Sequence, residues 1–255
     1  MALLVRHGAL NNAPSPESPA VSPPMTETAT VVWNKARRST LVQFVFFFLL
    51  VLASRSAIAD WNYVPSGSMK PTILEGDLIF VNRLAYDLKV PFTTLRVAHW
   101  ADPRRGDIVI AKSPETGERI VKRVVGLPGD HIEIRGQTLL INGEEPSFRN
   151  CPSTVASQLS DADRRSHALA VETLLGHSRP VMYGAPPSSL PLAGSLIIPE
   201  GRYFLMGDHR NNSRDSRFYG TVSREAILGQ ATHVIGSVQL DDDLAPRWKR
   251  FFSPM

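Results

Sequence analysis

The sequence predicts a mostly β globular part preceded by one N-terminal transmembrane helix. The helix is indicated by the apolar run LVQFVFFFLLVLA at residues 41–53. The β class is indicated by short runs rich in β-branched residues, which follow one another after residue 64 and are separated by Gly-Asp and Asn-Gly turns. The 255 residues, 43% of them hydrophobic, can bury a full core in one large domain or two smaller ones.

The charge pattern argues against nucleic-acid binding. The formal net charge is +4, but the 28 Lys and Arg residues are spread among 24 acidic residues, and no basic stripe with interleaved aromatic residues follows the globular part. Cys151 is the one cysteine, so it has no partner for an internal disulfide and none at metal-ligand spacing. We therefore expect no nucleic acid and no metal.

The first residues predict a disordered tail over 1–34. Five prolines stand here among Ser, Ala and Thr, without periodicity and with little to bury. Met25 is a second plausible start of the working protein.

Residues 35–61 predict a basic flank and a transmembrane helix. A helix rises about 1.5 Å per residue, so a hydrocarbon core about 30 Å thick needs roughly 20 residues, and the apolar span reaches this length only if it extends to Trp61. Between Leu41 and Ala59, Arg55 is the single charge, and its side chain is long enough to reach the headgroups. Three cations precede the apolar run, so the positive-inside rule places the tail in the cytoplasm and everything after Trp61 on the exported side.

Two other interpretations of this segment compete. A cleavable signal peptide would also have a basic flank and a short apolar region, and Ala57-Ile58-Ala59 would be its small-x-small cleavage site. A buried core helix is disfavoured, because phenylalanine on every face leaves no polar side.

The exported part predicts strands at 77–81, 106–111, 131–135, 138–141 and 201–206. The third and fourth form a hairpin, closed by a turn at 136–137 and followed by Asn142-Gly143. Residues 146–199 differ, since they combine a charged stretch with a Pro-rich one, and we expect an insertion of weak internal order. At 222–229, Ser223 can begin a short helical turn and Gly229 can end it.

Ser68 and Lys122 are the predicted nucleophile and base. Ser68 lies in PSGSMKPT with no histidine near it, and a serine hydroxyl is a useful nucleophile only when a neighbouring group takes its proton. An uncharged lysine can do so if its pKa falls from about 10.4 to roughly 7–8. Lys122 lies among β-branched residues in ERIVKRVV, which favours the dry environment that lowers a lysine pKa.

The turn that contains Ser68 also predicts an oxyanion hole. The Ser68 backbone N–H and the Ser66 hydroxyl are the candidate donors, and Gly67 allows a close approach. Lys70 is nearer in sequence but lacks the Ser-x-x-Lys helical spacing, so we expect it to be solvated. His209 is a rival base, and Asp241-Asp242-Asp243 is expected to be a solvated turn rather than a cation site.

Three motifs together resemble bacterial type I signal peptidase, a membrane-bound Ser/Lys protease family that removes signal peptides from exported proteins. They are PSGSMKPTI at 65–73, VKRVVGLPGD at 121–130 and GDHRNNSRDSR at 207–217. The resemblance covers roughly residues 42–240 and is weakest over 146–199. His209 stands where the family has asparagine, and a second membrane span and a cysteine pair found in relatives are lacking.

The resemblance implies roles for individual residues. Ser68 would attack the scissile carbonyl, Lys122 would be the base, Ser66 would help form the oxyanion hole, and Ser213 would orient the lysine. A supporting salt-bridge network would comprise Arg123, Asp208, Asp215 and Arg217. Shallow apolar pockets selecting small side chains, as at Ala-x-Ala sites, would be formed by Val64, Met69, Ile73, Ile79 and Val121. No cofactor is implied.

The resemblance also implies an architecture and a location. The family fold is a catalytic core of coiled antiparallel β-sheets with an inserted smaller β domain. The corresponding ranges are core at 62–130, insert at 131–199, core again at 200–243 and a basic, aromatic tail at 244–255. We expect a monomer with one span in the bacterial inner membrane, a cytoplasmic N-terminus and a periplasmic catalytic part. Its partners would be signal peptides and the lipid bilayer.

Three alternatives remain open from the sequence. A specialised peptidase of the same family could process a pilin or conjugation precursor. A non-catalytic relative could bind signal peptides, although intact Ser68, Lys122 and Ser213 argue against it. A secreted, soluble β protein with a cleaved leader would fit Ala57-Ile58-Ala59.

Overall fold

The computed structural model describes residues 39–52, 58–90, 93, 95–135, 138–185, 194–240 and 243–255. The chain divides into two units, Met1–Leu49 and Leu50–Met255. Residues 39–52 are helical. Within the described part of the chain, no helix has both the length and the apolar character needed to cross a membrane. The tail predicted at 1–34, and residues 35–38 and 53–57 of the predicted span, lie outside the described residues.

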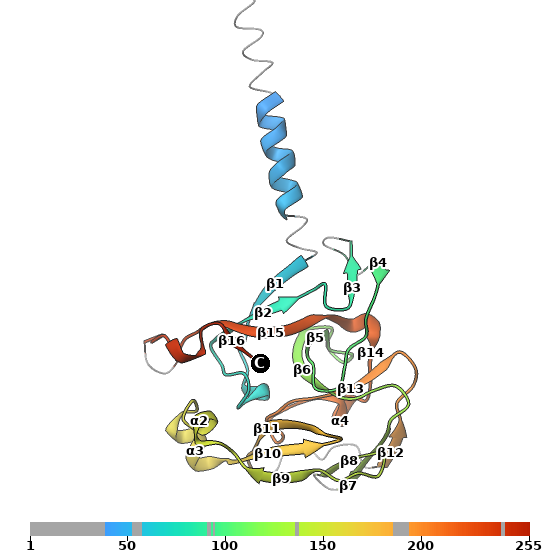
Figure 1. Ribbon diagram of the computed structural model, residues 1–255, viewed down its shortest axis with the longest axis vertical. Helices are drawn as coiled ribbons and strands as arrows, with labels where there is room; N and C mark the ends of the chain where they lie inside the picture. Colours follow the sequence, from blue (N-terminus) through green and yellow to red (C-terminus); the bar gives the residue numbers. More distant parts are fainter. Residues whose placement is uncertain are drawn as a thin grey trace, which may run out of the picture. The chain divides into compact units, whose positions relative to one another are not determined.

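The second unit is built around one antiparallel sheet (Figure 1). The strand order is β1-β2-β15-β5-β6-β13-β14, and β16 pairs with β15. The strands are β1 (Ala59–Tyr63), β2 (Asp77–Asn82), β5 (Ile108–Lys112), β6 (Arg119–Gly126), β13 (Arg202–Met206), β14 (Val222–Ser223), β15 (Ile227–Ser237) and β16 (Ser253–Pro254). The prediction of a mostly β fold is confirmed.

The sheet curls until strands that are not neighbours in its order meet. Arg119 at the start of β6 donates hydrogen bonds to Asp60 and Asn62 of β1, at 3.2 and 3.3 Å, although three strands separate β6 from β1 in the sheet. Register shifts in β15 against both β2 and β5 contribute to this curl, since bulges increase the local twist. The coiled antiparallel sheet implied by the resemblance is therefore present.

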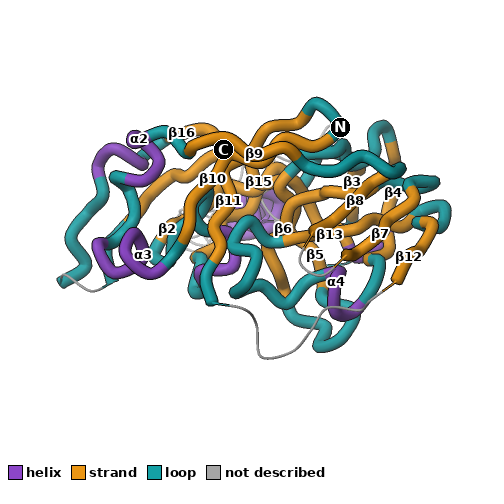
Figure 2. Tube along the Cα trace, turned by 90° about the horizontal axis from the view of Figure 1, so that it is seen from below, coloured by secondary structure: helices purple, strands orange, loops and turns teal. Residues whose placement is uncertain are grey.

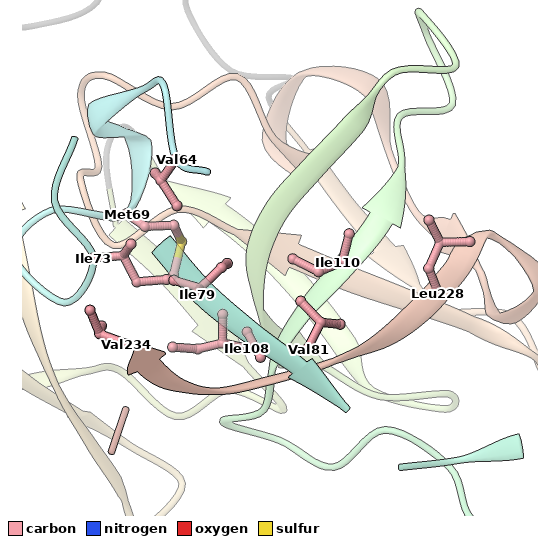
Figure 3. Packing of buried hydrophobic residues seen from close by; sticks show 10 residues of the cluster. Val64, Met69, Ile73, Ile79, Val81, Ile108, Ile110, Leu228 and Val234 are labelled. Atoms are coloured by element: carbon pink, nitrogen blue, oxygen red, sulfur yellow. The ribbon is translucent and has the colours of Figure 1, made fainter. Parts of the chain in front are cut away.

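An apolar cluster fills the inside of the curl next to the Ser68 turn (Figure 3). The cluster members from β2 follow from the two-residue period of this strand, in which Asp77, Ile79 and Val81 are buried and the residues between them are half-buried. Val64, Met69, Ile73 and Ile79, four of the predicted substrate-binding residues, belong to this cluster and are at most 2% exposed.

Residues 131–199 contain two smaller antiparallel sheets. One has the order β12-β7-β8, with β7 at His131–Arg135, β8 at Thr138–Ile141 and β12 at Gly194–Ile197, so the predicted 131–141 hairpin is confirmed. The other has the order β11-β10-β9, with β9 at Ser147–Asn150, β10 at Ala168–Leu174 and β11 at His177–Tyr183. Figure 2 shows the short helices α2 (Ser153–Ala156) and α3 (Asp161–Ser166) at the opposite end from β7, β8 and β12.

Two local predictions are wrong. The region expected to have weak internal order contains the paired strands β9, β10 and β11, because β10 buries Val171 and Leu174 and its one charge, Glu172, is neutralised by arginines. Gly229 does not end a helix: the helical turn is only Arg224–Ala226, and β15 begins at Ile227. A side chain at Gly229 would lie 2.8 Å from the Asn82 carbonyl oxygen, so this glycine permits the close approach of β15 to the end of β2.

The remaining elements connect these sheets. The hairpin of β3 (Asp87–Lys89) and β4 (Arg96–His99) is fixed by Arg224, which donates to Asp87 at 3.0 Å. Helix α4 spans Ser216–Tyr219, and one-turn 3-10 helices occupy η1 (Gly67–Met69), η2 (Arg224–Ala226) and η3 (Trp248–Arg250).

A buried ionic cluster joins the β9–β11 sheet to the loop after β13. Glu172 on β10 is paired with Arg179 on β11 and with Arg210, and all three residues are at most 5% exposed. Backbone hydrogen bonds run beside them, since Met182 N–H donates to the Asp208 carbonyl at 3.0 Å and Arg210 N–H donates to the Met182 carbonyl at 2.8 Å. The sheet therefore holds residues 208–210 in place.

We predict that Glu172→Ala destabilises the protein by about 3–5 kcal/mol, because it leaves two buried guanidinium groups without their carboxylate. Urea unfolding of the full chain in detergent measures this. The control is Glu133→Ala, whose partner Arg135 is 60% exposed, and we expect a much smaller change there, because solvent screens an exposed ion pair. Equal effects of the two substitutions would contradict the stabilising role of the cluster.

Candidate active site

Ser68 lies in a short, tightly held turn. It is the middle residue of η1, between buried Gly67 and Met69. The His209 N–H donates to the Ser68 carbonyl at 3.1 Å, and Met69 is anchored in the apolar cluster. A Cβ added at Gly207 would lie 2.4 Å from the Ser68 carbonyl oxygen, so only glycine lets the loop approach this closely. The turn leaves the Ser68 side chain half-buried.

Lys122 reaches Ser68 from the middle of β6. Its Nζ lies 2.8 Å from Ser68 Oγ, and the residue is 4% exposed. Burial, with a smaller contribution from Arg217, lowers the pKa of Lys122 to about 8 against the opposing effects of Asp215 and Asp208. At pH 7 roughly a tenth of the amine is therefore neutral, and this neutral form can accept the serine proton.

Asp215 is a buried carboxylate close enough to Lys122 to affect its pKa. It is completely buried and accepts hydrogen bonds from Arg217 Nε at 2.8 Å, from the Ser213 hydroxyl at 2.7 Å and from the Gly207 N–H at 2.9 Å. Burial alone would raise the pKa of Asp215, but these donors outweigh it and lower that pKa. Asp215 is thus a carboxylate whose charge is balanced by Arg217.

Ser213, predicted to orient the lysine, donates to Asp215 Oδ2. Its hydroxyl proton is therefore engaged, and only the oxygen lone pairs remain to accept a bond from another group. The side chain packs closely on Gly207, where an added Cβ would lie 2.2 Å from Ser213 Oγ.

A second buried ion pair joins Arg123, the residue after Lys122 on β6, to Asp208 in the loop after β13. Arg123 Nε and Nη2 donate to the two Asp208 oxygens at 2.9 and 2.7 Å, a bidentate geometry. Burial would raise the pKa of Asp208, but Arg123 and Thr72 outweigh it and lower that pKa. Thr72, which donates to Asp208 at 2.5 Å, was not singled out by sequence reasoning, although it stands only four residues after Ser68.

A cavity of about 130 Å³ opens beside the serine and the lysine. Its lining includes six of the residues predicted from the sequence, namely Val64, Ser66, Ser68 and Met69, together with Val121 and Lys122 from β6. Ser66 precedes η1 and its side chain makes no capping hydrogen bond to that turn. Ile73 and Ile79 lie in the cluster behind the cavity and are completely buried.

Lys70 is not solvated as expected. Its Nζ lies 3.0 Å from Asp163 and 3.2 Å from Glu75, and its side chain is 14% exposed. Burial alone would lower the pKa of Lys70, but the two carboxylates outweigh it and raise that pKa, so this amine stays charged. Sequence reasoning missed the contact because Asp163 is 93 residues away.

His209 contacts the backbone of the Ser68 turn. Its Nδ1 lies 3.3 Å from the Gly67 carbonyl oxygen, and its ring meets that of His167 edge to face, with centroids 4.9 Å apart. Burial lowers the pKa of His209, and His167 and Lys70 add to this. The described contacts of the imidazole are thus with a carbonyl and another ring, not with the serine hydroxyl.

The family model "Signal peptidase, peptidase S26" matches residues 37–235. A signal peptidase I of Pseudomonas fluorescens is 35% identical over 224 residues, covering 80% of this chain and 75% of the relative. A signal peptidase I of Pseudomonas aeruginosa is 37% identical over 202 residues, covering 73% and 67%.

Among solved structures, a signal peptidase I from Enterococcus faecalis is similar, with 31% identity and a TM-score of 0.31 over 51% of this chain and 97% of that one. The family model spans more than half of the chain, and both Pseudomonas relatives exceed 30% identity over most of it. The chain therefore belongs to the signal peptidase family, peptidase S26, and is a serine peptidase.

Proposed function

We propose that this protein is a membrane-anchored endopeptidase that removes N-terminal signal peptides from exported preproteins after small-x-small sites, using Ser68 and Lys122. The observation that carries the proposal is the 2.8 Å distance between Lys122 Nζ and Ser68 Oγ at an amine whose pKa burial lowers to about 8. Family membership and the named relatives support the substrate class.

The chemistry proceeds in two proton-balanced steps. Neutral Lys122 takes the proton of the Ser68 hydroxyl as Oγ attacks the scissile carbonyl carbon, and the Ser68 N–H and Ser66 hydroxyl stabilise the oxyanion. The lysine ammonium then gives its proton to the leaving amine as the peptide bond breaks. Lys122 next takes a proton from water, whose oxygen attacks the acyl ester, and returns it to Ser68. Ser213 bonds to Asp215, which is paired with Arg217. The second buried pair of the supporting network is Asp208 with Arg123.

The strand edges beside the dyad support binding of an extended peptide. Among the described pairings, β13 joins β6 only from Arg123 onward, whereas residues 119–122 pair with β5 alone. β1 pairs with β2 alone, and the end of β1 lies across the cavity from this part of β6. A substrate could add a strand here, because both edges offer backbone donors and acceptors. A cavity of about 130 Å³, walled by Val64, Met69 and Val121, favours small side chains.

Membrane anchoring and topology belong to the same proposal. They are supported by the apolar run at 41–53, whose described side chains are exposed, and by the cations before it. With the basic flank inside, residues 62–255 act on the exported side of the bacterial inner membrane, where 131–199 is an inserted smaller domain between the two core segments. The substrate's own apolar segment lies in the same bilayer.

We predict that Ser68→Ala and Lys122→Met each reduce preprotein processing by roughly a thousandfold or more, because each removes one half of the proton transfer. The measurement is cleavage of a preprotein with an Ala-x-Ala site. Lys122→Met keeps the fold, since a thioether is cheaper to bury than an amine. The matched controls are Ser195→Ala and Lys112→Ala, which alter exposed residues on β12 and β5. Full activity in either dyad variant would refute the mechanism.

We predict that kcat/KM rises about tenfold per pH unit below pH 8 and levels off above it, because only neutral Lys122 is a base. The same shift affects stability. The folded pKa is about 8 against 10.5 unperturbed, so the unfolded chain binds more protons between these values, and the cost of burying this amine falls as pH rises through that window. A pH–rate profile with unfolding measured in parallel tests both; a profile flat from pH 6 to 9 contradicts the assignment.

We predict that the mature protein keeps residues 41–61 and remains in the membrane fraction after alkaline extraction. Intact-mass measurement on that fraction is the test. A mature chain beginning at Asp60, after Ala57-Ile58-Ala59, and recovered in the soluble fraction would refute anchoring while leaving the dyad proposal standing.

A further inference from the structure

The peptide group between Gly67 and Ser68 carries the candidate oxyanion donor. Its N–H belongs to Ser68 and its carbonyl to Gly67, and in a planar trans peptide these two groups point in opposite directions. A contact that fixes the Gly67 carbonyl therefore also fixes the direction of the Ser68 N–H. Hydrogen bonds to the carbonyl polarise the peptide group as well, which makes its N–H a stronger donor.

Two donors hold the Gly67 carbonyl. The Lys70 N–H donates to it at 3.1 Å within the turn itself, and His209 Nδ1 lies 3.3 Å from it. A carbonyl oxygen only accepts, so His209 Nδ1 carries the proton of this bond. The backbone N–H of His209 also donates to the Ser68 carbonyl at 3.1 Å. His209, which is 3% exposed, thus fixes the peptide groups on both sides of Ser68.

The His209 ring is supported in turn by His167, at the end of α3. The two rings meet edge to face, with centroids 4.9 Å apart. His167 Nδ1 lies 3.0 Å from the Asp163 carbonyl oxygen and 2.8 Å from Ser166 Oγ, so this second imidazole is tied to its own helix. A Cβ added at Gly184 would lie 2.8 Å from His167 Cδ2, so glycine leaves the ring its room.

Helix α3 contacts the Ser68 turn by a second route. Asp163 pairs with Lys70 at 3.0 Å, and the Asp163 N–H donates to Ser160 Oγ, which caps the helix. Lys70 is two residues after Ser68, whereas the contact through His209 is with the residue before it. The inserted region therefore holds this turn from both ends.

The residues that line the peptide cavity do not include His209, so its effect on a substrate is indirect. We infer that His209 is a positioning residue that directs the Ser68 N–H toward the oxyanion, and that His167 of the inserted region supports it. This inference rests on the proposed function. Asparagine, the family's residue at this position, carries an amide donor at Nδ2 but has no ring for His167 to pack against.

The test measures kcat and KM separately on a peptide with an Ala-x-Ala site, with full-length protein in detergent. His209→Leu removes the donor, and kcat should fall about 10–100-fold while KM stays within about twofold, because the oxyanion forms only in the transition state and loss of a whole oxyanion donor costs about 10²–10³-fold. His209→Asn should restore kcat to within about fivefold of wild type, since Nδ2 can donate to the Gly67 carbonyl.

Leu139→Ala is the control for loss of stability, because Leu139 is buried on β8 in another apolar cluster. It should lower Tm and leave kcat unchanged. A further measurement uses a peptide aldehyde, which forms a hemiacetal when Ser68 Oγ adds to its carbon and its oxygen enters the oxyanion site. His209→Leu should raise the Ki of the aldehyde by the factor by which it lowers kcat/KM.

His167→Ala keeps the test decisive if His209→Leu fails to fold, since the His167 side chain is 20% exposed. It should lower kcat about 3–10-fold, and His131→Ala, at an exposed histidine on β7 of the same region, should not. Wild-type kcat in His209→Leu, a change confined to KM, or a loss that His209→Asn does not restore overturns the inference and leaves the dyad standing. Activity that survives Ser68→Ala would instead refute the proposed function, and this inference with it.

Discussion

The candidate site depends on the Lys122 amine being buried near two carboxylates, Asp215 and Asp208, without forming an ion pair with either of them in the described structure. Lys122 is near enough to Asp215 and Asp208 for both to raise its pKa, yet burial lowers that pKa to about 8. This is possible because each carboxylate is bonded to an arginine, Asp215 to Arg217 and Asp208 to Arg123. The arginines thus help to keep the pKa of Lys122 low, because they neutralise carboxylates that would otherwise stabilise its ammonium form.

The two arginine–carboxylate pairs also fix geometry. Asp215 receives the Gly207 N–H and the Ser213 hydroxyl, so the chain on both sides of residues 208–212 is tied to one side chain. Asp208 is joined through Thr72 to the segment after Ser68, and the His209 N–H donates to the Ser68 carbonyl. The Ser68 turn, the β6 lysine and the loop after β13 are therefore held by one continuous hydrogen-bonded network, which restricts the Lys122–Ser68 distance.

The region at 131–199 contributes to this network rather than lying apart from it. Glu172 and Met182 bind residues 208–210 through the buried ionic cluster and two backbone bonds. Order in the loop after β13 therefore depends on a buried ionic cluster that lies outside the main sheet.

Much of this could be predicted from residue types and their order. Alternation in 77–81 and 131–135 and the turn dipeptides predicted the strands, because a strand's two faces are set by neighbouring residues. A serine without a nearby histidine, together with one lysine in a β-branched run, predicted which residues to pair. The contacts of Lys70 with Asp163, Thr72 with Asp208 and Glu172 with Arg210 could not be predicted, because they join segments 38 to 136 residues apart.

The sequence by itself determined the fold class and the family, since these follow from local patterns and from motifs, and it predicted which serine and which lysine would be nucleophile and base. Only the tertiary structure decided how dry Lys122 is and which carboxylate each arginine neutralises. Burial and charge balance are properties of the space around a side chain, and that space is formed by strands that meet only when the sheet curls.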